Sequence, residues 1–313
     1  MSEPHPHPAS PEPHDLGQRV SAWLSSATFP PAGTPIRCGV SGGADSLALM
    51  ALAVAAGCDV TAVHVDHGQR SGSAEEAGLV ARYAAEVGAN FEPHTVEIEP
   101  GSNLEARMRS ARYAVLGQDA ATGHTADDQA ETLLINLVRG TGLVGLGAMT
   151  PGHRRPILSL RREDTEAICA TLGWVPVMDE SNDDPAFLRN RMRHEVIPLL
   201  NEVAGRDVTP LLERSSDHAR AAASVLKEQA RTVDPTDAKQ LAAAQPPVAA
   251  IALQDWIRAE TGDEHRIDAA SVERVLAVAR GDAKAAEVNG GWRVHRSKQR
   301  LRLTSSVGRE SVS

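Results

Sequence analysis

The chain has 313 residues, 42% of them apolar, and a formal net charge of −9 at pH 7. This length suits two domains of roughly 100–200 residues each, with enough apolar side chains to build cores. No stretch approaches the ~20 consecutive apolar residues of a membrane-spanning helix, and the first residues lack the layout of a signal peptide, so the sequence predicts a cytoplasmic protein without membrane contact.

The first two thirds of the chain alternate short apolar runs with longer helical stretches. Residues 1–14 are rich in proline, serine and histidine and predict a disordered tail. After them we expect helices at 16–26, 46–56, 74–87, 103–116, 127–138 and 162–171, and strands at 36–40, 59–65, 91–98, 120–123 and 156–158. Such alternation is typical of βαβ units around a parallel sheet, whose ligands gather at the carboxyl ends of the strands.

Beyond about residue 198 the composition changes to alanine-rich helix, expected at 211–233, 247–260 and 269–280. Residues 288–303 predict a two-stranded hairpin around Lys298. The predicted organisation is therefore a Rossmann-like α/β domain with a parallel sheet at residues 15–203, followed by a smaller, mostly helical α+β domain at 204–313.

The cysteines are dispersed along the chain, whereas many of the arginines lie in local groups. Cys38, Cys58 and Cys169 lie far apart without a CxxC pair, which favours small buried apolar side chains over a metal or redox site. The negative net charge disfavours nucleic-acid binding, and runs of like charge usually face water. Three local groups nevertheless concentrate positive charge: Arg107, Arg109 and Arg112; Arg189, Arg191 and Arg193; and Arg293, Arg296, Lys298, Arg300 and Arg302.

The most specific local feature is the sequence SGGADS, between the first predicted strand and the next helix. Its residues are Ser41, Gly42, Gly43, Ala44, Asp45 and Ser46. Adjacent glycines let the backbone approach an anion, and N–H groups at a helix start carry partial positive charge. A carboxylate would repel bare phosphate, so we expect Asp45 to act through a bound Mg²⁺. The alternative is an ordinary glycine turn that caps a helix.

This loop resembles the SGGxDS loop of the PP-loop ATP pyrophosphatases, and it is neither a Walker loop nor a GxGxxG turn. The resemblance implies cleavage of ATP between its α- and β-phosphates, transfer of AMP to a substrate oxygen and retention of pyrophosphate in the loop. Further segments resemble the tRNA(Ile)-lysidine synthases, over about residues 35–200. The resemblance places His64 and Asp66, in the segment HVDHG, beside the adenosine, and turns Arg112 toward the active site to neutralise an adenylated intermediate.

The segment GHTADDQAET, at residues 123–132, is the most informative of these. Helix capping accounts for Asp127, but it does not require His124, Asp128 and Glu131 as well. Acids and histidine that face a phosphate loop can hold Mg²⁺ and transfer protons. With Arg139 following, the segment resembles the GHxxDDxxET…RG stretch of the lysidine synthases.

The predicted catalytic domain closes with the motifs DESN, at 179–182, and RNRMR, at 189–193, which resemble the close of the family's catalytic domain. If extended, Arg189, Arg191 and Arg193 form an edge that contacts phosphates. If helical, they spread around the helix axis, which favours simple exposure to solvent. The stretch between Tyr113 and Gly123 is shorter than expected for the family, which predicts a trimmed helix or fourth strand.

The resemblance implies three substrates: ATP with Mg²⁺, free L-lysine, and tRNA(Ile) with a CAU anticodon. The wobble cytidine is adenylated on its 2-carbonyl oxygen, and the lysine ε-amine then displaces AMP to form lysidine. An amine with a solution pKa near ~10.4 must first lose a proton, and His124 and Asp128 are both candidate bases. The accessory domain and the arginine groups are the predicted tRNA contacts.

The predicted site residues fall into three groups by role. The catalytic residues are Asp45, Arg112, His124 and Asp128. The nucleotide-binding residues are Ser41 to Ser46 together with His64 and Asp66, with Asp45 as the Mg²⁺ ligand. The substrate or tRNA-binding residues are Asp127, Glu131, Arg139, Arg189, Arg191 and Arg193.

Three other functions stay open. A tRNA-thiolating PP-loop enzyme shares the adenylation step, but it needs reactive or cluster-binding cysteines, and none here lies in a CxxC pair or beside the site motifs. An amide-forming PP-loop synthetase gives no reason for the RNxxR close. A non-catalytic binding protein gives no reason for Asp45, His124, Asp127 and Asp128 to be present together.

Overall fold

The computed structural model describes residues 13–66, 73–96, 104–178, 184–262, 267–288 and 290–305. The chain divides into two compact units: unit 1 comprises Met1–Ile135 and Ala148–Arg214, and unit 2 comprises Asn136–Gly147 and Ser215–Ser313. The domains predicted at 15–203 and 204–313 were contiguous, whereas in the structure the internal segment Asn136–Gly147 groups with the C-terminal residues. No helix in the described ranges is both long and apolar enough to cross a membrane.

A four-stranded parallel sheet forms the centre of unit 1. Its order is β3-β2-β1-β4, with bounds Asn90–Thr95, Asp59–Asp66, Pro35–Gly39 and Ala121–Thr122. The predicted α/β class with a parallel sheet is confirmed. Strand β4 is only two residues long, as the shortened stretch before it predicted, yet it still pairs with β1 through Cys38↔Ala121 and Gly39↔Thr122.

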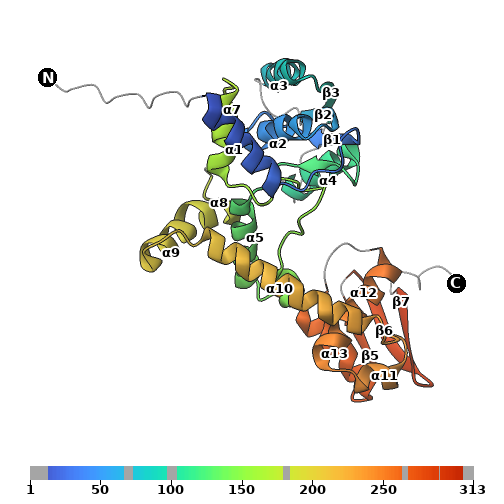
Figure 1. Ribbon diagram of the computed structural model, residues 1–313. Helices are drawn as coiled ribbons and strands as arrows, with labels where there is room; N and C mark the ends of the chain where they lie inside the picture. Colours follow the sequence, from blue (N-terminus) through green and yellow to red (C-terminus); the bar gives the residue numbers. More distant parts are fainter. Residues whose placement is uncertain are drawn as a thin grey trace. The chain divides into compact units, whose positions relative to one another are not determined.

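Helices α1 (Pro13–Ser26), α2 (Ala44–Ala55), α3 (Ser73–Val87) and α7 (Arg162–Thr171) contribute to the main core on one face of this sheet, and α4 (Leu104–Leu116) packs on the other face. Helix α5 (Ala126–Val138) follows β4, and α8 (Leu188–Arg191), a π-helix (Met192–Val196), α9 (Ile197–Ala204) and α10 (Thr209–Ala230) follow α7 along the chain. Helices α5 and α10 cross the boundary between the units (Figure 1).

Alternate residues of the central strands supply two separate cores. Val60 and Ala62 of β2 pack in the main core with residues of α2, α3 and α7, whereas Val63 packs with Leu116 of α4 in a smaller cluster. Successive strand residues point to opposite faces, so a strand that is buried on both sides carries a nearly continuous apolar run. Both faces are therefore closed, and the carboxyl ends of the strands remain as the place for a site.

The strand predicted at residues 156–158 is wrong. The backbone there forms local turns, in which Leu158 donates to Arg155 and Leu160 donates to Ile157. Ile157 and Leu158 are buried. The apolar run reflected burial, and burial alone does not distinguish a strand from a packed turn.

Unit 2 combines helices with a three-stranded antiparallel sheet, in the order β5-β6-β7. Its elements are α6 (Leu143–Leu146), α11 (Ala238–Ala243), α12 (Pro246–Thr261), α13 (Ala269–Arg280), β5 (Ala285–Val288), β6 (Trp292–Ser297) and β7 (Arg300–Ser305). The predicted hairpin is confirmed as β6 and β7, joined by Lys298 and Gln299 with φ of 48° and 67°. Strand β5 was missed, because three residues of its sequence AAEV, two alanines and a glutamate, are of types depleted in strands.

Candidate active site

The predicted phosphate loop connects β1 with α2 at the carboxyl end of the sheet. Gly42 has a φ of +93°, and a Cβ there would lie 3.1 Å from the side chain of Val177. Gly43 precedes α2 in an extended conformation, and no side chain caps the helix. The N–H of Ser46 donates to the Gly43 carbonyl at 3.1 Å, whereas Ala44 and Asp45 precede the first intrahelical acceptors, so their N–H groups give this loop the geometry of an anion site.

Ser46 fixes the shape of this loop from inside. Its hydroxyl accepts the N–H of Ser41 at 3.1 Å and donates to the carbonyl of Gly43 at 2.9 Å. Ser46 is buried, whereas Ser41 is exposed. Ser41 is therefore the better placed of the two hydroxyl groups to meet a ligand.

The segment after β4 packs directly against the start of α2. A Cβ on Gly123 would lie 2.6 Å from the carbonyl oxygen of Asp45 and 3.0 Å from the backbone nitrogen of Ser46. Only glycine permits this approach of two backbones. The contact brings the next residue, His124, to the same end of the sheet as the phosphate loop.

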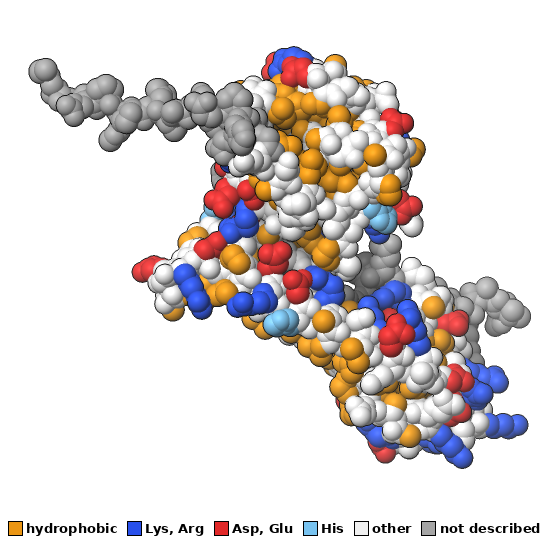
Figure 2. All heavy atoms as spheres, in the orientation of Figure 1, with side chains coloured by type: hydrophobic (Ala, Val, Ile, Leu, Met, Phe, Trp, Pro, Cys, Tyr) orange, Lys and Arg blue, Asp and Glu red, His pale blue; other side chains and the backbone are white. Residues whose placement is uncertain are grey.

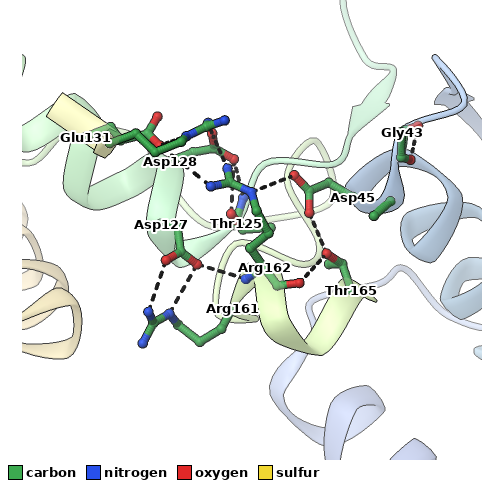
Figure 3. Close-up of polar contacts among 12 residues, drawn as sticks. Gly43, Asp45, Thr125, Asp127, Asp128, Glu131, Arg161, Arg162 and Thr165 are labelled. Atoms are coloured by element: carbon green, nitrogen blue, oxygen red, sulfur yellow. Dashed lines mark hydrogen bonds and ion pairs between the residues drawn. The ribbon is translucent and has the colours of Figure 1, made fainter. Parts of the chain in front are cut away.

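The carboxylate of Asp45 is held by two residues of α7 (Figure 3). The Thr165 hydroxyl donates to Oδ1, and Arg162 Nε lies 3.6 Å from Oδ2. Burial raises the pKa of Asp45, and the hydrogen bond from Thr165 and the charge of Arg162 oppose that rise. Helix α7 therefore supplies the polar partners of the phosphate loop's only acid.

Asp128 lies in the first turn of α5 and is almost fully buried. Its Oδ2 accepts the N–H of Thr125 at 2.9 Å and the Thr125 hydroxyl at 3.1 Å. Its Oδ1 lies 3.6 Å from guanidinium nitrogens of Arg162 and Arg193. Burial alone raises the pKa of Asp128, but the charges of His124 and Arg162 bring the pKa below its ordinary value. Asp128 is therefore an ionised carboxylate at neutral pH.

Glu131, one turn further along α5, is fully buried. Arg193 Nε donates to its Oε1 at 2.6 Å, and Arg189 Nε lies 3.5 Å from Oε2. Burial raises the pKa of Glu131, although the hydrogen bond from Arg193 opposes that rise. Within the described residues, Oε2 has no hydrogen-bond partner. The burial of this charged carboxylate is therefore favourable only while its arginine neighbours compensate its charge.

Arg162 joins the three carboxylates and was not predicted. Its guanidinium nitrogens lie 3.6 Å from Asp45, 3.6 Å from Asp128 and 3.9 Å from Glu131. The pair Arg161-Arg162 opens a predicted helix, where cations are unfavourable for the helix dipole, and that misplacement was the available sequence signal.

A family model and the sequences of known proteins were compared with this chain, and their matches agree with one another. A model of the PP-loop domain matches residues 19–200. The chain is 42% identical to the tRNA(Ile)-lysidine synthase of Nocardia farcinica, over 67% of this chain and 69% of that protein. It is 34% identical to the tRNA(Ile)-lysidine synthase of Corynebacterium glutamicum, over 90% of this chain and 94% of that protein.

The chain belongs to the tRNA(Ile)-lysidine synthase family. It is a PP-loop enzyme of tRNA modification, as the resemblance in its motifs predicted. A solved structure, the U34-tRNA thiolase of Methanococcus maripaludis, superposes with a TM-score of 0.53 over 67% of this chain and 81% of that chain. At 14% identity this likeness shows the shared fold alone.

The cysteines bear on the thiolating alternative within the wider PP-loop class. All three are buried and unpaired, which confirms their predicted packing role. Cys169 nevertheless touches the site, because its thiol donates to the carbonyl of Ala44 at 3.6 Å, so the expectation that no cysteine lies beside the motifs is wrong. Burial raises the pKa of Cys38 and of Cys169 to about 12 each. Such thiols are poor nucleophiles, which disfavours sulfur transfer.

Asp127 has a structural partner in this lysidine synthase family member. Its carboxylate accepts two hydrogen bonds from Arg161, at 3.0 and 3.1 Å, and the backbone N–H of Arg162 at 2.8 Å (Figure 3). Asp127 therefore fixes the start of α7 and the position of Arg162. Its predicted role in binding substrate stays a prediction.

The RNxxR close of the domain is helical, and its arginines point in different directions. Arg189 and Arg193, four residues apart, both reach Glu131. Arg191 is exposed and pairs with Glu195 at 3.0 Å. The helical backbone of the second alternative is confirmed, with a π-helix beginning directly after α8, but the exposure to solvent that it implied is wrong for Arg189 and Arg193. Arg191 has the most exposed side chain of the three, at 54%, and it is the one that does not pair with Glu131.

The remaining predicted residues come from other elements of the chain. His64 is buried in β2, and its Nδ1 lies 2.9 Å from the carbonyl oxygen of Val40. Asp66 ends β2, Arg112 is exposed on α4, and Arg139 is exposed after α5, in unit 2. The predicted motif residues at 67–68 and 179–182 lie outside the described residues.

Replacing Gly123 with alanine is expected to lower the free energy of unfolding by about 1–3 kcal/mol and to weaken ATP binding, because the new methyl group overlaps the backbone of Asp45. Urea unfolding and equilibrium binding of ATP measure the two effects. Gly78→Ala is the matched control: it lies within α3 with open space around it and should stabilise by about 0.5–1 kcal/mol. Equal behaviour of the two variants would contradict the close approach at Gly123.

Proposed function

We propose that this protein joins L-lysine to carbon 2 of the wobble cytidine in the CAU anticodon of tRNA(Ile), converting ATP to AMP and pyrophosphate. One observation carries the proposal: the phosphate loop and the segment with His124 and Asp128 meet at Asp45. A site for ATP cleavage and candidate groups for proton transfer therefore lie together. The names of the similar proteins support the substrate assignment.

The residues present fit ATP together with Mg²⁺. Among the described residues, no three acids, histidines or cysteines gather into a metal site of their own. Asp45 offers one carboxylate beside the loop, and Mg²⁺ in proteins commonly binds one or two carboxylates together with substrate phosphates. Asp45 would hold an ion that arrives with the nucleotide, and that ion would neutralise phosphate charge.

In the first step, the 2-carbonyl oxygen of the cytosine attacks the α-phosphorus of ATP. The bond from this phosphorus to the bridging oxygen breaks, and its electron pair leaves with pyrophosphate. The backbone N–H groups at the start of α2 would hold this leaving group, with Ser41 as an added donor. Arg112 is proposed to neutralise the adenylated base, as the family resemblance implies.

In the second step, the lysine amine attacks carbon 2, loses a proton and expels AMP. The carboxylate of Asp128 accepts two hydrogen bonds from Thr125 and lies 3.6 Å from guanidinium nitrogens of Arg162 and Arg193, so it is a weak base whatever the state of His124. We therefore assign the proton transfer to His124. Its Nδ1 lies 2.7 Å from the Thr122 hydroxyl, and this hydroxyl lies 3.3 Å from the Arg154 carbonyl. We propose that Nδ1 donates to the hydroxyl, which places the lone pair for proton transfer on Nε2.

The base can enter the site only after it leaves the anticodon stack, as in other enzymes that act on bases. Discrimination between tRNA(Ile) and the tRNA(Met) that shares its anticodon requires contacts outside the anticodon. We propose that Arg191 and the C-terminal residues make such contacts, since Arg189 and Arg193 are engaged by Glu131.

Arg191→Gln is therefore expected to weaken tRNA binding several-fold and to reduce the slope of log affinity against log salt by about 0.7–0.9, the contribution of one phosphate contact. ATP affinity should not change. Filter binding across a salt series measures the slope, with Arg37→Gln as a control, because Arg37 pairs with Glu92 in the sheet. An unchanged slope would remove Arg191 from the tRNA contacts.

Pyrophosphate release tests the proposal as a whole. With ATP, Mg²⁺ and lysine, release is expected with tRNA(Ile) that bears the CAU anticodon, and background release with tRNA(Met) or without RNA. Comparable release with all three would overturn the assignment of tRNA(Ile).

A further inference from the structure

Arg162 has an unusual position for an arginine in a buried acid cluster. Its backbone N–H is fixed by Asp127 at 2.8 Å, so the start of its side chain is well anchored. Its guanidinium is about one quarter exposed and, among the described residues, has three carboxylates at 3.6–3.9 Å but no hydrogen bond. A guanidinium carries five N–H donors in a planar fork, so its donor capacity is largely unused.

We propose that Arg162 is a further catalytic residue, which binds the α-phosphate of ATP; this inference rests on the proposed function. The guanidinium lies between Asp45, on the phosphate-loop helix, and Asp128, on α5. In the proposed reaction, pyrophosphate leaves toward the loop and the base is modified beside His124. The reacting phosphorus therefore lies between these two elements, where Arg162 lies (Figure 3).

To bind a phosphate, the guanidinium of Arg162 has to turn away from its carboxylate neighbours, and the remaining charges of the cluster permit this movement. Three carboxylates, Asp45, Asp128 and Glu131, face three guanidiniums, and Arg193 and Arg189 continue to neutralise Asp128 and Glu131 when Arg162 turns away. Asp45 is then left for the Mg²⁺ that accompanies ATP. A phosphate accepts two parallel hydrogen bonds from a guanidinium at hydrogen-bond distance, so it competes well with carboxylates that are 3.6 Å away.

During adenylation, the cytosine oxygen bonds to the α-phosphorus as the bond to the β-phosphate oxygen breaks. Negative charge then spreads over the non-bridging oxygens of the reacting phosphate. Hydrogen-bond donors that reach these oxygens stabilise the transition state more than the ground state. Arg162 would therefore contribute to binding of the α-phosphate and, in addition, to the rate of the first step.

Equilibrium binding of AMP and of pyrophosphate to the full chain tests the proposal without any turnover. AMP carries the α-phosphate, whereas pyrophosphate reports on the loop. Arg162→Gln is expected to weaken AMP binding about 10- to 100-fold and to leave pyrophosphate binding within about twofold. Arg162→Lys, which keeps the charge but loses the fork, should be intermediate, and Arg37→Gln should bind both probes as the wild type does.

An unchanged AMP affinity in Arg162→Gln would overturn the proposal, and so would an equal loss for both probes, which would indicate general damage to the site. These outcomes are independent of lysine and tRNA. A failure of the proposed function appears instead in the wild type, as pyrophosphate release that does not depend on tRNA(Ile).

Discussion

Replacing His124 with alanine is expected to slow lysine transfer by about 10²- to 10⁴-fold, the usual contribution of a general base. The first step needs no proton removal, so pyrophosphate release in a single turnover should stay close to that of the wild type. The adenylated tRNA should then accumulate. Rapid-quench measurements with radiolabelled ATP and lysine resolve the two steps.

The pH dependence of this variant gives a second test. Without a base, the reaction depends on lysine that is already deprotonated, and its amine has a pKa near ~10.4. The rate of His124→Ala should therefore rise almost tenfold for each pH unit between pH 7.5 and 9.5, and the wild-type rate should rise much less. An equal loss of both steps would contradict this role, and a selective loss of lysine transfer in Asp128→Asn would assign the base to Asp128 instead.

Replacing Arg193 with methionine is expected to lower the free energy of unfolding by about 3–5 kcal/mol at pH 8, because a buried charge loses its closest partner. Arg193 donates to the fully buried Glu131 at 2.6 Å. Arg191→Met is the matched control, since Arg191 is an exposed helical pair with Glu195 and should cost at most about 1 kcal/mol. Urea unfolding of both variants measures the difference.

The destabilisation by Arg193→Met should be smaller at pH 5 than at pH 8. Burial raises the pKa of Glu131 in the folded state above its unfolded value, and loss of Arg193 removes an interaction that opposes that rise. The folded state then binds a proton that the unfolded state releases, so stability falls as the pH rises through the raised pKa. A loss that is independent of pH would contradict the assignment of Glu131 as the charge left without its partner.

The phosphate loop could be predicted because its chemistry lies in six consecutive residues between a strand and a helix. The segment around His124 could be predicted equally well, since its residues lie together at the start of one helix. Arg162 was not, because its contacts with Asp45 and Glu131 join three separate helices. Sequence spacing records neighbours along one element, whereas this cluster depends on how α2, α5 and α7 pack.

The arginines at the end of the catalytic domain show the same limit. Their spacing by two fits both a strand and a helix, and the two alternatives imply opposite roles for Arg189 and Arg193. The structure gives them a third role, because both arginines pair with the buried Glu131 from one side of the helix. The sequence shows the group of arginines, but it does not show that Glu131 is the partner of two of them.

The central claim is that lysine becomes attached to the wobble cytidine, and incorporation of radiolabelled lysine into tRNA tests it most directly. The label should enter tRNA(Ile) with a CAU anticodon only when ATP and Mg²⁺ are present, and should be absent from a transcript with uridine at the wobble position. Pyrophosphate release without incorporation of lysine, or equal labelling of both transcripts, would contradict the account.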